Sequence, residues 1–124
     1  MRLVVVAVGR VKDRALRAAL DDYLGRLRRY GPTGTFWQSH PALPRKPITS
    51  WQIWNEPNLP VYWQPKPRAS KYVALLKATA GAIKAADPTA QVLTAGLPKS
   101  KLGIPLTTYI RQIYRDTIDD LYGF

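Results

Sequence analysis

The sequence contains no cysteine, only eight acidic residues and no long apolar run. The absence of cysteine excludes a disulfide framework, zinc-thiolate sites and thiol catalysis, and no metal site is predicted. No stretch approaches the roughly 20 apolar residues of a membrane span, so we expect no membrane partner. The amino terminus lacks the length and cleavage signal of a secretory peptide, which leaves a cytoplasmic location as the default expectation.

Basic residues, by contrast, are abundant. Nineteen Lys and Arg give the 124-residue chain a formal net charge of +11. Such a charge raises encounter rates with nucleic acid, anionic lipid or acidic polysaccharide. Because the charges are spread along the chain, they favour a basic surface over a dedicated anion site, and they predict nucleic acid only as an unspecific partner. The length fits one compact domain.

Three segments are typical of β-strands. Residues 3–8 are apolar and rich in valine, as expected for a strand buried on both faces of a parallel sheet. Residues 48–54 and 91–97 predict the second and third strands. Within the strand predicted for residues 48–54, Trp51 is assigned to the core.

Helical spacing of apolar residues predicts three helices, which follow Asp13, Ser70 and Thr107 or Thr108. The polar face of the first helix is basic and carries Arg14, Arg17, Arg28 and Arg29. Proline-rich residues 31–50 predict a loop without regular helix. The resulting β-α-β-α-β-α order predicts an α/β fold with parallel strands, either part of a TIM barrel or a small open sheet.

Glu56 follows the second predicted strand, where α/β enzymes collect catalytic groups. Apolar neighbours such as Trp54 and Trp63 disfavour its charged form, as a general acid requires. Asn55 can donate a hydrogen bond to a sugar hydroxyl, and the rings of Trp37, Trp54 and Trp63 can stack on pyranose faces. The alternatives stay open: a Glu56 that only pairs with an arginine, and tryptophans that anchor loops.

The run Trp54-Asn55-Glu56-Pro57-Asn58 resembles the Asn-Glu-Pro signature at the fourth barrel strand of clan-A retaining glycoside hydrolases. The similarity covers roughly residues 28–115. It implies a truncated TIM barrel, an O-glycosidic carbohydrate substrate, Glu56 as acid/base, and Asn55 as a ligand of substrate and nucleophile. Retaining cleavage needs a second carboxylate about 5 Å from the first, and no residue is assigned to it. Hydrolysis and simple binding both stay open, and the exposed strand edges of half a barrel predict self-association.

The amino-terminal segment from Met1 through the helix ending at Tyr30 is similar to the start of SPOUT-class methyltransferases, which modify a pseudouridine of large-subunit ribosomal RNA. That family binds S-adenosylmethionine through glycine-rich loops in a knotted carboxyl-terminal half, which nothing after residue 31 matches, so no cofactor is predicted. The chain is then one α/β domain over 1–124, or a fusion of a βα unit (1–30) with a glycosidase-like fragment (31–124). The leading hypothesis is a glycoside hydrolase-like fragment; the alternative is an RNA-binding protein related to ribosomal RNA methyltransferases.

Overall fold

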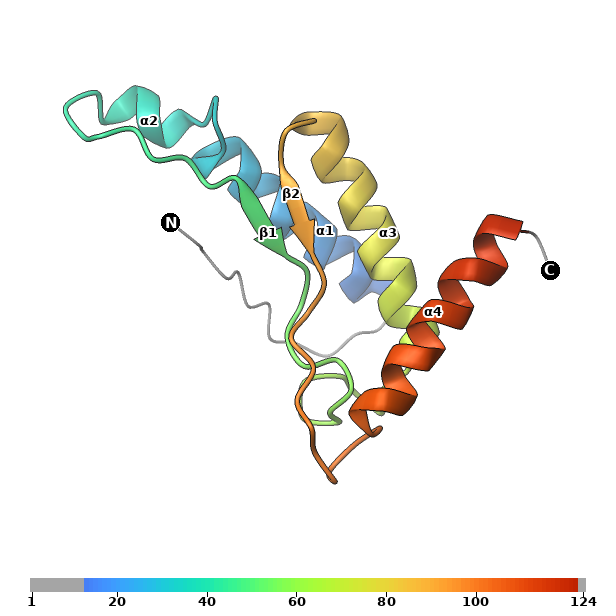
Figure 1. The fold of residues 1–124 in the computed structure, drawn as a ribbon. Helices are drawn as coiled ribbons and strands as arrows, with labels where there is room; N and C mark the ends of the chain where they lie inside the picture. The colour runs from blue at the N-terminus through green and yellow to red at the C-terminus, as the bar shows by residue number, and fades with distance from the viewer. Residues whose placement is uncertain (1–12, 123–124) are drawn as a thin grey trace.

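The computed structural model describes residues 13–122 (Figure 1). The strand predicted for residues 3–8 lies outside this part of the chain. The described residues form four helices and two short strands. In chain order these are α1 (Asp13–Tyr30), α2 (Thr35–Ser39), β1 (Ser50–Gln52), α3 (Ala69–Ala86), β2 (Gln91–Leu93) and α4 (Leu106–Tyr122).

β1 and β2 form a small open sheet. The two strands are parallel, and Trp51 lies opposite Val92 in the register. Helix α3 connects them, as a parallel pair requires a crossover. The predicted mixture of helices with parallel strands is therefore confirmed as a small open sheet, whereas residues 13–122 do not form a TIM barrel.

The helices pack around this sheet. In Figure 1, α1 and α3 lie together behind the two strands, α4 packs against α3, and α2 lies beyond the end of α1. The apolar spacing of α1 has the predicted effect: Tyr23 and Leu27 are buried, while the arginines of its polar face are exposed. No helix in the described part is long and apolar enough to cross a membrane.

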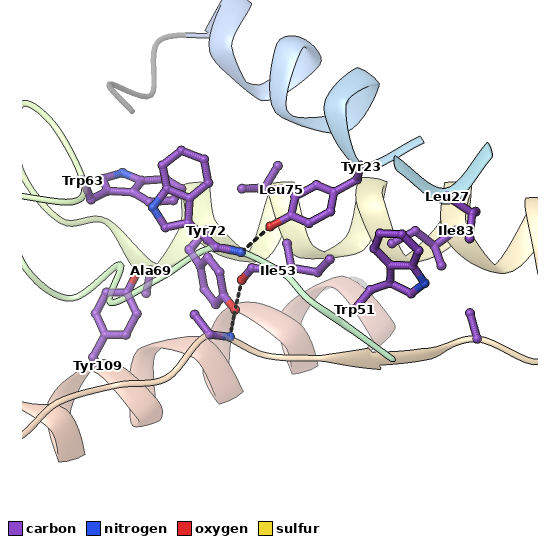
Figure 2. Close-up of a cluster of buried hydrophobic side chains, with 13 residues drawn as sticks. Tyr23, Leu27, Trp51, Ile53, Trp63, Ala69, Tyr72, Leu75, Ile83 and Tyr109 are labelled. Atoms are coloured by element: carbon purple, nitrogen blue, oxygen red, sulfur yellow. Dashed lines mark hydrogen bonds between the residues drawn. The ribbon is translucent and has the colours of Figure 1, made fainter. Parts of the chain in front are cut away.

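One core joins α1, α3, α4 and the two strands, and Figure 2 shows much of it; α2 contributes no buried residue. Trp51 is fully buried in this core, in agreement with its predicted assignment. The main contributors are Tyr23, Leu27, Trp51, Ile53, Trp54, Trp63, Tyr72, Leu75, Ile83 and Tyr109.

Two local predictions are corrected. Residues 31–50 contain the helix α2, because the prolines of this segment lie at positions 32, 41, 44 and 47 and leave Thr35–Ser39 uninterrupted. Helix α3 starts two residues earlier than predicted, with Arg68 rather than Ser70 at its N-cap, and Arg68 makes no side-chain capping hydrogen bond.

Both strands are shorter than predicted. Regular pairing ends at Gln52 and Leu93, although the apolar pattern continues beyond both residues. The two segments still run side by side, since Ile53 N–H donates to the Leu93 carbonyl (3.0 Å) and Glu56 N–H to the Gly96 carbonyl (3.2 Å). An apolar sequence pattern indicates that residues are buried, and here the buried segment is longer than the segment with regular strand pairing.

Candidate nucleic-acid interface

Two buried tyrosine hydroxyls fix the chain where β1 ends. Tyr23 Oη donates to the Gln52 carbonyl (3.0 Å) and accepts from Trp54 N–H (2.7 Å). Tyr72 Oη donates to the Ile53 carbonyl (3.2 Å) and accepts from Ala95 N–H (2.6 Å). Sequence patterning places both tyrosines on apolar helix faces but does not reveal that their hydroxyls replace lost strand pairing.

Because each hydroxyl satisfies two buried backbone groups, we expect Tyr72→Phe to destabilise the fold by about 1–3 kcal/mol. Urea unfolding followed by circular dichroism would measure this loss as a lower midpoint at unchanged slope. The matched control is Tyr114→Phe, because the side chain of Tyr114 is largely exposed. Equal stabilities of the two variants would contradict the role of the hydroxyl.

The segment after β1 turns sharply at the predicted catalytic residue. Trp54 and Glu56 have positive φ angles of 69° and 42°, which non-glycine residues rarely adopt. Hydrogen bonds hold this conformation, including one from Leu59 N–H to the Glu56 carbonyl (3.0 Å). The side chains of Asn55 and Glu56 are half-buried. Within residues 13–122, no group of three His, Asp or Glu side chains could hold a metal ion.

Trp54 and Trp63 belong to the core. They are 3% and 2% exposed, and their rings meet edge to face at 5.6 Å. The Trp54 indole N–H donates to the Tyr62 carbonyl (3.1 Å), and Trp63 packs edge to face on Tyr72. A ligand could stack on either ring only by displacing these neighbours.

Trp37 is not brought to this turn. It lies in α2, beyond the start of β1, whereas Glu56 follows the other end of that strand (Figure 1). The predicted site residues are therefore split between the turn after β1 and the α1–α2 junction.

At the α1–α2 junction, four aromatic rings form a cluster that sequence reasoning did not single out. Phe36 is central: its ring stacks on His40 (4.4 Å), meets Trp37 edge to face (5.1 Å) and lies 5.6 Å from Tyr30. The position of the Trp37 ring is fixed by its indole N–H, which donates to the Tyr30 carbonyl (3.3 Å). The signal in the sequence that could have predicted this cluster is the close spacing of Tyr30, Phe36 and Trp37, the first just before the proline-rich residues 31–50 and the other two within them. His40 is exposed.

A hollow of about 350 Å³ opens beside this cluster. It is lined by Thr33, Gly34, Trp37, Gln38 and Arg45. The amide of Gln38 donates to the Thr33 carbonyl (3.4 Å), and the Arg45 guanidinium donates to the Pro32 carbonyl. The hollow thus combines one aromatic wall with one cationic wall.

A second hollow, of about 520 Å³, lies along the end of α1. Its lining includes Arg26 and Arg29 together with Asp21, Asp22, Gly25 and Tyr30. Arg26 pairs with Asp22 (2.9 Å) on the surface, and the Arg29 guanidinium lies 5.3 Å from the centre of the Tyr30 ring. Exposed cations continue on both sides of the junction, at Arg14, Arg17, Arg28, Arg29, Arg45 and Lys46.

No protein-family model matches the chain. Over 30 residues, however, it is 80% identical to the "Ribosomal RNA large subunit methyltransferase H" of Sorangium cellulosum (strain So ce56). The matched segment is 24% of this chain, and the chain spans 21% of that protein's length. This match is consistent with the resemblance of the first thirty residues to SPOUT-class methyltransferases.

The interpretation of the chain as a glycoside hydrolase of carbohydrate metabolism is wrong in the light of this match. The named similar protein acts on ribosomal RNA, and neither the comparisons nor the fold support a carbohydrate partner. The catalytic role of Glu56 and the binding roles of Asn55, Trp54, Trp63 and Trp37 came from the corrected interpretation and remain untested. Self-association and the fusion near residue 30 also stay predictions.

Proposed function

We propose that this protein binds RNA through the basic-aromatic surface, defined as the exposed arginines of α1 together with Trp37 and Arg45. The observation that carries the proposal is the 80% identity over 30 residues to a methyltransferase named for ribosomal RNA. The proposal concerns binding, since the match spans about a fifth of that protein.

The net positive charge of the chain also supports RNA binding. Each phosphate that a Lys or Arg neutralises releases condensed counterions, so cationic surfaces bind RNA in a salt-dependent way. With a net charge of +11, the chain is suited to a polyanion. Arg17, Arg28 and Arg29 lie exposed on α1, and the aromatic cluster adjoins the end of the same helix. Arginine beside exposed aromatic rings is the combination with which proteins contact both phosphates and bases.

The test removes three charges from this surface. In the variant Arg17→Gln, Arg28→Gln, Arg29→Gln, we expect RNA affinity to fall roughly a hundredfold at about 0.1 M salt, because each lost phosphate contact lowers the salt slope by about 0.7. Fluorescence anisotropy of a labelled single-stranded RNA, titrated between about 50 and 200 mM salt, would measure affinity and slope together.

A matched control removes the same charge elsewhere. Lys99, Lys101 and Arg111 are exposed in the β2–α4 connection and in α4, away from α2 (Figure 1). Changing all three to glutamine should leave affinity much closer to that of the unmodified chain. Equal losses in both triple variants would indicate binding by diffuse charge, and no RNA binding by the unmodified chain would reject the proposal.

A further inference from the structure

The Trp37 ring is positioned before any ligand arrives. Its indole N–H donates to the Tyr30 carbonyl, and Phe36 supports it edge to face. It is only partly buried, and it lines the hollow of about 350 Å³. A flat ring held in place at an open hollow loses little side-chain entropy when a second flat ring stacks on it.

The other walls of this hollow are polar or cationic. Gln38 contributes an amide, Thr33 a hydroxyl and Arg45 a guanidinium, and no acidic side chain is among the lining residues. The neighbouring hollow on α1 differs, because Asp21 and Asp22 form part of its lining. An anionic ligand that carries a flat heterocycle therefore finds better complementarity beside Trp37 than along α1.

We propose that this hollow binds one unpaired base of single-stranded RNA, with Trp37 stacking on the base and Arg45 facing the adjacent phosphate. The inference rests on the proposed RNA binding and names the form of RNA and its point of contact. Every base has a π-face, so stacking tolerates any sequence, but the faces are accessible only where the bases are unpaired. The chain is thus expected to prefer single strands to duplexes of the same sequence.

Trp37→Ala in the full chain provides the main test. Because stacking on an aromatic side chain contributes about 1–3 kcal/mol per base, we expect affinity for a single-stranded oligonucleotide to fall roughly 5- to 100-fold. Affinity for the matching duplex, and the salt slope for both, should stay the same. Trp37→Phe keeps a ring in place and should retain most of the binding.

Tryptophan fluorescence gives an independent readout. The other three tryptophans, Trp51, Trp54 and Trp63, are buried, so quenching by single-stranded RNA should come from Trp37. Trp37→Phe should abolish this quenching while binding persists. If quenching remains undiminished in that variant, the base does not stack on Trp37.

The remaining outcomes separate the two proposals. If the triple arginine variant loses affinity but Trp37→Ala weakens single strands and duplexes equally, RNA binding stands and the base site is rejected. If circular dichroism shows that Trp37→Ala is unfolded, Gln38→Ala and Arg45→Gln take its place; unchanged single-strand affinity in both would overturn the inference. Absence of binding to either form of RNA rejects both proposals.

Discussion

Replacement of Trp51 by alanine is expected to destabilise the protein by about 3–5 kcal/mol, the usual effect of truncating a buried large aromatic side chain. Trp51 is fully buried in β1, in the cluster that also holds Tyr23, Leu27 and Ile83 (Figure 2). Tyr23 and Leu27 lie on α1 and Ile83 lies on α3, so closing the cavity would require two helices to move toward β1. Since domains of this size are stable by only about 5–15 kcal/mol, a substantial fraction of the variant should be unfolded at physiological temperature.

Urea and thermal unfolding, both followed by circular dichroism, would measure this effect. Two controls sharpen it. Trp51→Phe retains a ring and removes an indole N–H that has no hydrogen-bond partner among the described residues, so its loss should be much smaller. Val61→Ala alters a side chain that is 67% exposed and should be nearly neutral. A Trp51→Ala variant as stable as Val61→Ala would contradict the contribution of the buried Trp51 ring to stability.

Above pH 10 the folded protein is expected to lose stability steeply. Desolvation by burial raises the pKa of Tyr72 to about 12, and burial likewise raises the pKa values of Tyr23 and Tyr109 above the ordinary 10.0. Between pH 10 and the raised pKa of each tyrosine, the unfolded chain has released a proton that the folded chain still holds. The unfolding free energy is therefore nearly constant with respect to these groups well below pH 10, and above pH 10 each group lowers it by at most about 1.4 kcal/mol per pH unit, until the pH passes the raised pKa of that group. Tyr72 alone accounts for about 2 kcal/mol by pH 12.

Urea unfolding at a series of alkaline pH values would reveal this decline, and tyrosinate absorbance would show whether ionisation accompanies unfolding. Tyr72→Phe starts from lower stability, but its decline with pH should be shallower, since one of the titrating groups is gone. Tyr114→Phe, which alters an exposed residue, should follow the slope of the unmodified chain. Parallel slopes for Tyr72→Phe and the unmodified chain would count against the raised pKa of Tyr72.

Periodicity predicts the three long helices well. The apolar stripe of α1 is visible in sequence, and Tyr23 and Leu27 are indeed buried while Arg17 and Arg28 are exposed. Strand ends were less predictable, because Ile53 and Trp54 are as apolar as a paired strand would be. Beyond the ladder, Trp54 N–H donates to the hydroxyl of Tyr23 and the Ile53 carbonyl accepts from the hydroxyl of Tyr72, so distant tyrosines satisfy backbone groups that strand pairing would otherwise satisfy.

The candidate site was harder to predict than the fold. Trp54 and Trp63 both lie in the irregular segment between β1 and α3, where the neighbouring sequence does not distinguish a buried ring from an exposed one. The hollow beside Trp37 depends on Arg45, whose guanidinium contacts Pro32 thirteen positions earlier. Sequence therefore indicated the exposed charge of α1, whereas the partners of individual aromatic rings depend on contacts between distant residues.

The hydroxyl of Tyr23 has a consequence for how this chain can be inherited. Tyr23 lies in the part whose resemblance is to methyltransferases, while Gln52 and Trp54, its two backbone partners, lie beyond residue 30. A recombination event that exchanged the first thirty residues would remove an oxygen that the β1 segment cannot supply for itself. Only a replacement segment that carries a tyrosine at the same position of the helix would satisfy the Gln52 carbonyl and Trp54 N–H. The two parts of the chain are therefore expected to be inherited together.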